Sequence, residues 1–252
     1  MIGFSCCTMA QSEIIFTNGF EIIIPLLKLN DTGITGSGDY PLGNNIGCIS
    51  NMTSPQDCNV GRDATHPDPT DGIAGFSFTK LDASGTALAD QSVDYATTPW
   101  SCVQDNVTGL VWEVKTPSTD VGSIHNQDNT YQWGGLTAIG RDHPDRQGIY
   151  YDGWNTLVQG SNDDTLCGFD NWRVPTVTEL SSIVNRGTFN PAIDSNYFPD
   201  TDSTSFLSSS FWSSSPIANA YEHAKYITFS FGRDGIRYRD SGARVRLVRS
   251  GQ

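Results

Sequence analysis

The sequence predicts an α+β protein with twisted antiparallel strands, one or two helices and long irregular loops. Hydrophobic residues make up only 37% of the 252 residues, whereas Gly, Ser, Thr, Asn and Asp are abundant, which is typical of loop-rich extracellular proteins. Several short stretches alternate between apolar and polar residues, as strands with one buried face do. One segment carries complete start and stop signals for a helix.

Residues 1–29 are expected to be a leader remnant and a connector. The first ten residues are small and apolar and end at Ala10, as at the end of a secretory signal, but they lack a basic start and a long apolar stretch. No Leu lies three residues before Cys6, so a lipid anchor is the lesser alternative. The apolar run at 21–27 is too short to span a membrane, and we expect no membrane span.

Residues 30–99 are expected to form an N-terminal module rich in Gly, Asn and Asp. Turn-forming residues fill 30–75, with almost no periodic hydrophobicity. The stretch FSFTKLD at 76–82 alternates and predicts a strand. The composition of 30–75 would also suit a disordered segment, but a disulfide between Cys48 and Cys58, ten residues apart, would order it.

The cysteines predict two disulfides and an oxidising compartment. No pair has the C-x-x-C spacing of a zinc site, and no histidine accompanies them at ligand spacing. The last four lie in polar, loop-like surroundings, and we pair them as Cys48–Cys58 and Cys102–Cys167. The alternative is four reduced thiols in a cytosolic protein.

A hairpin is predicted at 101–115, where two alternating stretches flank a turn near Asn106 or Gly109. Leu110, Trp112 and Val114 would share one face of its second strand. Residues 120–170 are irregular, apart from the short amphipathic stretch DGWNTLVQG at 152–160.

The strongest predicted helix covers about 177–186. Thr176 is a good N-cap residue, and Glu179 completes a capping box three residues later. Gly187 would end the helix in a left-handed conformation. The apolar stripe of this helix consists of Leu180, Ile183 and Val184.

Four more strands are predicted at 208–216, 225–231, 235–239 and 243–249, with the turn of the central hairpin at 232–235. Arginines alternate with apolar residues in the last two strands. One face of this ribbon is therefore predicted to be apolar and the other basic. Phe229, Phe231, Ile236 and Tyr238 are expected on the core side.

Positive charge is concentrated in this C-terminal part of an acidic protein. The formal net charge is −13, yet residues 225–252 carry +5, which leaves −18 for the remainder. The total charge excludes a uniformly basic nucleic-acid binder, so an anion site must be local. The basic residues of this segment are Lys225, Arg233, Arg237, Arg239, Arg244, Arg246 and Arg249.

Several blocks of sequence together resemble a known bacterial family over about residues 100–252. The blocks are, in order, DNVTGLVWEVK, TYQW, GFDNWRVPTVTEL, FWSSSP and the terminal VRLVRSGQ. This set is similar to the C-terminal domain of the Lcl collagen-like adhesin, formerly a domain of unknown function. The resemblance implies a C-type-lectin-like fold, an extracellular location and ligand binding rather than catalysis.

The family's adhesin domain is trimeric and binds sulfated glycosaminoglycans through a positively charged surface, which makes a trimer and an anionic glycan the expectations here. The present chain has no collagen repeat that would enforce a trimer. The expected function is a secreted or surface-exposed protein of adhesin type that recognises a glycan or a protein partner. The alternatives are a structural module of an envelope or extracellular assembly, and an enzyme of the same fold.

The candidate ligand-binding residues are Arg233, Arg237, Arg239, Tyr226 and Tyr238. Guanidinium groups bind carboxylate or sulfate oxygens in pairs of hydrogen bonds, and tyrosine rings suit stacking on sugars. The competing interpretation is structural: arginines near the C-terminus pair with aspartates, and tyrosines pack within strands. We expect this structural role chiefly for Arg246 and Arg249.

Neither catalysis nor a cofactor is expected. The four histidines lie in polar loops, and there is no nucleophile motif such as G-x-S-x-G. The oxygen-rich loops around Asp128 and around Asp200 and Asp202 would allow a structural Ca²⁺ ion, although none has EF-hand spacing. Solvated loops with Asx turns are the competing interpretation of the same residues.

Overall fold

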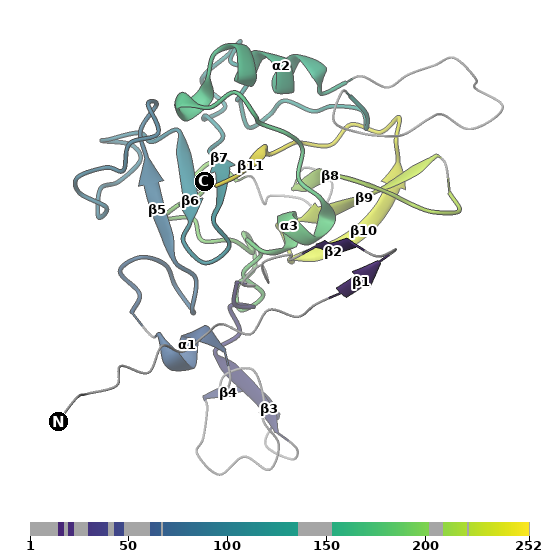
Figure 1. The fold of residues 1–252 in the computed structure, drawn as a ribbon. Helices are drawn as coiled ribbons and strands as arrows, with labels where there is room; N and C mark the ends of the chain where they lie inside the picture. Colours follow the sequence, from purple (N-terminus) through teal and green to yellow (C-terminus); the bar gives the residue numbers. More distant parts are fainter. Residues whose placement is uncertain are drawn as a thin grey trace.

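The chain is an α+β protein, as predicted, in a computed structural model. Figure 1 shows a four-stranded sheet on the left and a three-stranded sheet on the right, with short helices above, between and below them. The structure describes residues 15–17, 20–22, 30–39, 43–47, 61–66, 68–135, 153–201, 209–220 and 222–251.

The larger sheet is antiparallel and has the strand order β11-β7-β6-β5. The predicted hairpin at 101–115 supplies its two central strands, and Gly109 takes a positive φ of 75° in the turn between them. The outer strands lie far apart in the sequence: β5, which precedes the hairpin, pairs with β6, and the C-terminal β11 pairs with β7. The strands are β5 (Phe78–Leu81), β6 (Cys102–Asp105), β7 (Leu110–Glu113) and β11 (Val248–Ser250).

The smaller sheet is also antiparallel and has the order β10-β9-β8. Its strands are β8 (Ser210–Pro216), β9 (His223–Thr228) and β10 (Arg233–Tyr238). The segment between β10 and β11 joins the two sheets: Arg244 exchanges backbone hydrogen bonds with β8, and the carbonyl of Leu247 accepts one from Glu113 of β7. The end of the chain therefore connects both sheets.

The described residues form two apolar cores. The first contains Leu110, Trp112 and Val114, which confirms the predicted hairpin face, together with residues of α3 and β9. The second contains Trp154, Leu157 and Val158 from the predicted amphipathic stretch. The disulfide Cys102–Cys167 lies in this second core and is confirmed.

The helices are short. They are α1 (Arg62–Thr65), α2 (Asn155–Asp163), the 3-10 turn η3 (Leu166–Gly168) and α3 (Val177–Ser181). The predicted capping box is confirmed at α3, where Thr176 and Glu179 satisfy each other's backbone amides. Leu180, Ile183 and Val184 are buried as expected.

The predicted C-terminal stop of this helix is wrong. The α-helix ends at Ser181, and Gly187 does not take a positive φ. The chain leaves the helix early because the amide of Asn185 donates to the carbonyl of Ala192, which is a tertiary contact that a longer helix would lose.

Replacing Thr176 by Ala is expected to lower the free energy of unfolding by about 1 kcal/mol, since the amide of Glu179 loses its cap. Urea unfolding of the variant measures this effect. Thr178→Ala is the control, because Thr178 is exposed on the same helix and does not form the cap. Equal stability of the two variants would contradict the capping role.

The N-terminal residues form two small antiparallel ribbons, β1 with β2 and β3 with β4. Their bounds are β1 (Ile15–Thr17), β2 (Phe20–Ile22), β3 (Gly36–Asp39) and β4 (Gly43–Gly47). The predicted disulfide Cys48–Cys58 lies outside the described residues. No helix among the described residues is long and apolar enough to cross a bilayer.

Candidate functional site

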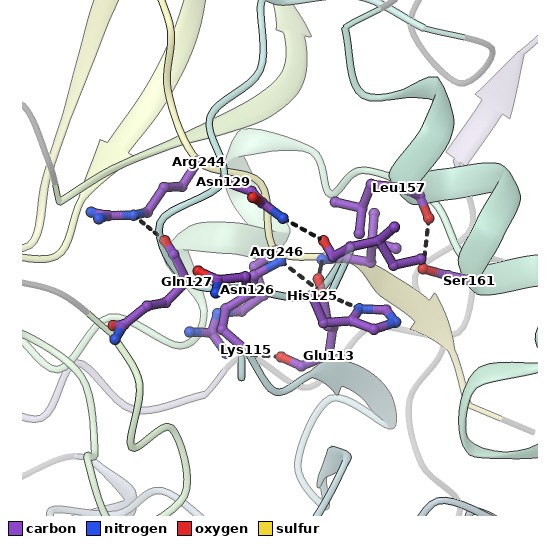
Figure 2. A network of polar contacts seen from close by, with 12 residues as sticks. Glu113, Lys115, His125, Asn126, Gln127, Asn129, Leu157, Ser161, Arg244 and Arg246 are labelled. Atoms are coloured by element: carbon purple, nitrogen blue, oxygen red, sulfur yellow. Dashed lines mark hydrogen bonds and ion pairs between the residues drawn. The ribbon is translucent and has the colours of Figure 1, made fainter. Parts of the chain in front are cut away.

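The last arginines of the chain lie inside the protein rather than on a binding surface. Arg244, Arg246 and Arg249 are all at most 5% exposed. Arg246 donates to the carbonyl of Glu113 at 2.8 Å and to the hydroxyl of Thr201 at 2.7 Å, and its guanidinium lies over the ring of Phe198. Figure 2 shows Arg246 at the centre of a polar network.

A buried glutamate balances part of this charge. Glu113 is fully buried and accepts from Lys115 at 2.7 Å and from His125 at 2.7 Å (Figure 2). Burial alone would raise the pKa of Glu113, but the positive charge of Lys115 and the hydrogen bond from His125 outweigh it and lower this pKa to about 2. Burial lowers the pKa of Arg246 to about 10, against the pull of Glu113 and Asp200.

The other two arginines are held in similar ways. Arg244 donates to the carbonyl of Gln127 and pairs with Asp128 at 3.2 Å. Arg249 lies 3.7 Å above the ring of Phe169 and donates to the side chain of Asn171. These contacts explain why an acidic protein concentrates arginine at its end: the side chains link the last segment to the interior.

The two arginines of β10 and Arg239, which directly follows the strand, lie in three different environments. Arg239 is buried, stacks 4.2 Å above the ring of Trp133 and donates to the carbonyl of His223. Arg237 is half-buried on the face that carries Tyr226. Arg233 is exposed at the turn between β9 and β10.

The structure reverses the predicted faces of β10. Ile236 and Tyr238 are 54% and 57% exposed, although they were expected on the core side. Tyr226 is buried over Gly235, and burial raises its pKa against the positive charge of Arg237. On this face of β9 the first core includes Ile227 but not Lys225. Ile236, which pairs with Lys225, therefore remains open to solvent.

The predicted turn is also displaced. Arg233 pairs with Thr228, so the hairpin turns over residues 229–232 rather than 232–235. Gly232 takes the positive φ of 63° within this turn. As a result Phe231, expected in the core, is 51% exposed beside Arg233.

An open groove of about 650 Å³ lies at this turn. We call it the Phe189–Phe231 groove. Both phenylalanines are exposed, at 71% and 51%, and the guanidinium of Arg233 lies 5.8 Å from the ring of Phe231. Its lining consists of Ile34, Thr35, Gly36, Arg186, Gly187, Thr188, Phe189, Phe231 and Arg233.

Hydrogen bonds between two loops place these side chains together. The loop after α3 follows the β9–β10 turn, because the amide of Asn190 donates to the carbonyl of Ser230 at 2.9 Å and that of Ala192 to Phe229 at 2.6 Å. Arg186 donates across to the carbonyl of Gly232 at 2.6 Å. This contact fixes the second guanidinium beside the groove.

The lining of the groove is positively charged, unlike two other hollows of the protein. Its described lining has two arginines and no acidic residue. A second hollow has Lys80 with Asp94 and Asp194. A third has Asp120 and Asp200 and no basic residue. Of these three, the Phe189–Phe231 groove is the one suited to an anion.

The donors of the groove are available to a ligand. Within the described part of the chain, Arg186 uses two of its five N–H groups, on the carbonyl of Gly232 and on the hydroxyl of Ser181. Among the described residues Arg233 has a ring contact but no hydrogen-bond acceptor. Exposed rings beside unused guanidinium donors can hold a ring-shaped ligand that carries carboxylate or sulfate groups.

Sequence reasoning found Arg233 and missed the rest of the groove. Arg186 and Phe189 lie in NRGTFNP, directly after the predicted helix, and an aromatic residue among turn formers was the available signal. Tyr238 lies against His223 at 4.2 Å, on the outer face of the hairpin. Tyr226, Arg237, Tyr238 and Arg239 are not part of the groove lining.

The family model of the Lcl C-terminal domain matches residues 101–249, which is more than half of the chain. The chain belongs to the Lcl C-terminal domain family. This confirms the resemblance drawn from the sequence blocks. No curated protein and no solved structure matches the chain.

The Lcl C-terminal domain contains the buried network and most of the groove. Arg186, Phe189, Phe231 and Arg233 lie within the matched residues, whereas Ile34, Thr35 and Gly36 lie before them. Asp128, one of the candidate calcium ligands, pairs with Arg244. Asp202 lies outside the described residues, and those that are described include no group of three potential metal-binding side chains.

Proposed function

We propose that this member of the Lcl C-terminal domain family is a secreted or surface-exposed protein of adhesin type that binds an anionic glycan in the Phe189–Phe231 groove. One observation carries the proposal: two exposed phenylalanines line the same hollow as two arginines that keep N–H groups without an acceptor among the described residues. The aromatic rings offer stacking surfaces, and the guanidinium groups offer paired donors for sulfate or carboxylate.

The disulfide supports the proposed extracellular location. Cys102–Cys167 is fully buried and spans 65 residues, and such bonds form and persist in oxidising compartments. Two antiparallel sheets, short helices, long irregular stretches and a disulfide between β6 and η3 are also compatible with a C-type-lectin-like fold. We include that fold in the proposal.

Binding is proposed rather than catalysis because of the groove chemistry. Its described lining has no histidine, cysteine or carboxylate that could act as a nucleophile or general base. The alternatives are a protein ligand in the same groove and a purely structural module. A glycan array distinguishes them, since neither alternative predicts selective binding of anionic sugars.

Arg233→Ala is expected to weaken binding of heparin by about tenfold at low salt, because a charge-assisted hydrogen bond contributes about 1.5–3 kcal/mol. Wild-type binding should fall steeply with added salt, since screening acts within about 8–10 Å near physiological ionic strength. The free energy of unfolding should change by less than about 1 kcal/mol, because Arg233 is exposed. Titrations at two salt concentrations and a melting curve measure both quantities.

Lys225→Ala is the matched control for this experiment. It removes one positive charge from the same hairpin, but Lys225 pairs with Asp234 and is not part of the groove lining. Equal weakening in both variants would show that net charge, not the groove, controls binding. Failure of the folded wild type to bind any anionic glycan at low salt would eliminate the proposed ligand class.

A further inference from the structure

Residues 30–36 lie against the Lcl C-terminal domain, at the groove. The amide of Arg186 donates to the carbonyl of Thr32 at 2.7 Å. Asn30 donates to the buried carboxylate of Asp105 at 2.8 Å. A segment that precedes the matched residues is therefore hydrogen-bonded both to the loop that carries Arg186 and to the end of β6.

The segment and the loop that carries Arg186 approach each other so closely that neither Gly33 nor Gly187 has room for a side chain. Gly33 has a φ of +80°, and a Cβ there would lie 2.2 Å from Oδ1 of Asn185. A Cβ on Gly187 would lie 2.0 Å from the carbonyl oxygen of Gly33. Gly187 thus packs against the backbone of Gly33, and Gly33 packs against the side chain of Asn185, so a side chain at either position would displace the segment.

The packing fixes the residues that follow. Directly after Gly33, the segment supplies Ile34, Thr35 and Gly36 to the lining of the groove. The carboxylate of Asp31 holds the other side of the segment, because it accepts from the amides of Thr32 at 2.7 Å and Asp63 at 2.9 Å. One wall of the groove therefore comes from outside the family's domain.

This wall differs chemically from the rest of the groove. Its three residues are uncharged, whereas both arginines of the groove belong to the matched domain. Attraction to an anion comes from the arginines and weakens with salt. Contact with the uncharged wall depends on shape and is much less sensitive to salt.

We infer that residues 30–36 form a specificity-determining wall: the arginines attract an anionic glycan, and the wall selects among anionic glycans by shape. The inference rests on the proposed function. Because the ligand would contact the wall, ligand binding and docking of residues 30–36 stabilise each other, as thermodynamic linkage requires.

The test compares wild type with Gly33→Ala, whose new side chain pushes the segment off Asn185 without altering a lining residue. Hydrogen exchange at the amide of Arg186, which donates to Thr32, reports docking. Binding of heparin and of chondroitin sulfate is measured at two salt concentrations. We expect faster exchange, a change of about fivefold or more in the ratio of the two affinities, and an unchanged salt dependence.

A second variant keeps the wall docked. Ile34→Glu places a negative charge in the groove and is expected to weaken heparin binding by at least about tenfold, because opposed like charges are strongly unfavourable. Ser118→Glu makes the same charge change at an exposed position outside the groove and is the control. It should change binding by less than about twofold.

The possible results are distinguishable. If wild type binds neither glycan, the proposed function fails and the inference fails with it. If wild type binds, but Gly33→Ala exposes the Arg186 amide with no change in the affinity ratio, the inference alone is overturned. It is also overturned if that amide stays protected in Gly33→Ala, or if Ile34→Glu and Ser118→Glu bind equally.

Discussion

Glu113→Gln is expected to lower the free energy of unfolding at pH 7 by about 3–5 kcal/mol, because it removes the negative charge beside a fully buried Lys115. The substitution preserves the shape of the side chain, so little of the loss would come from packing. Urea unfolding measures it. Glu222→Gln is the control, since the side chain of Glu222 is 42% exposed.

The same variant should also change the dependence of stability on pH. The pKa of Glu113 is lowered from 4.5 to about 2, so its ionised form contributes stability that is complete above pH 4.5 and is lost as pH falls toward 2. The shift corresponds to about 3 kcal/mol across this window. Burial raises the pKa of Asp105, Asp194 and Asp200, which acts in the opposite direction.

The difference in the free energy of unfolding between wild type and Glu113→Gln therefore isolates the contribution of this carboxylate to stability. It should shrink as the pH falls from 4.5 to 2, while the difference between wild type and Glu222→Gln stays small. A pH-independent difference would contradict an ionised Glu113 in the native state.

Loss of the Cys102–Cys167 bond is expected to have the second large effect on stability. The bond closes 65 residues, for which the chain-entropy model gives about 4 kcal/mol. The double variant Cys102→Ala/Cys167→Ala should therefore melt about 10 °C lower than the wild type. Reduced wild type should behave like the double variant. A melting temperature within about 2 °C of the oxidised protein would show that packing alone holds β6 against η3.

Features with short-range causes were predictable from the sequence. The capping box of Thr176 and Glu179 depends on residues three apart, and the hairpin of β6 and β7 depends on alternation around Gly109. The burial of Trp154, Leu157 and Val158 follows from helical spacing. Each of these signals lies within one segment.

The orientation of β10 was not predictable, since alternation separates two faces but does not say which face is buried. The face of Arg237 is covered because Tyr226 on β9 turns toward the second core. The other face of β10, which carries Ile236, is open because the first core includes Ile227 of β9 but not Lys225, the partner of Ile236. Both causes are tertiary.

The candidate site was predictable at one residue for the same reason. Arg233 lies in a segment that stands out by its charge, whereas Ile34 and Phe189 lie far from it in the sequence and belong to turn-rich stretches. Their proximity arises from backbone contacts such as that between Gly33 and Gly187, which no periodic pattern encodes.

The position of β5 shows that the folded unit extends beyond the residues that the family model matches. The family signature begins at residue 101, yet β6 pairs with β5, and Phe76 and Phe78 belong to the first core. A recombinant fragment that begins at residue 101 would lack β5 and both phenylalanines. It would leave the edge of β6 unpaired and expose apolar residues of the first core, and both changes favour aggregation. A fragment of this chain made for expression should therefore begin well before residue 101, so that it includes Phe76 and β5.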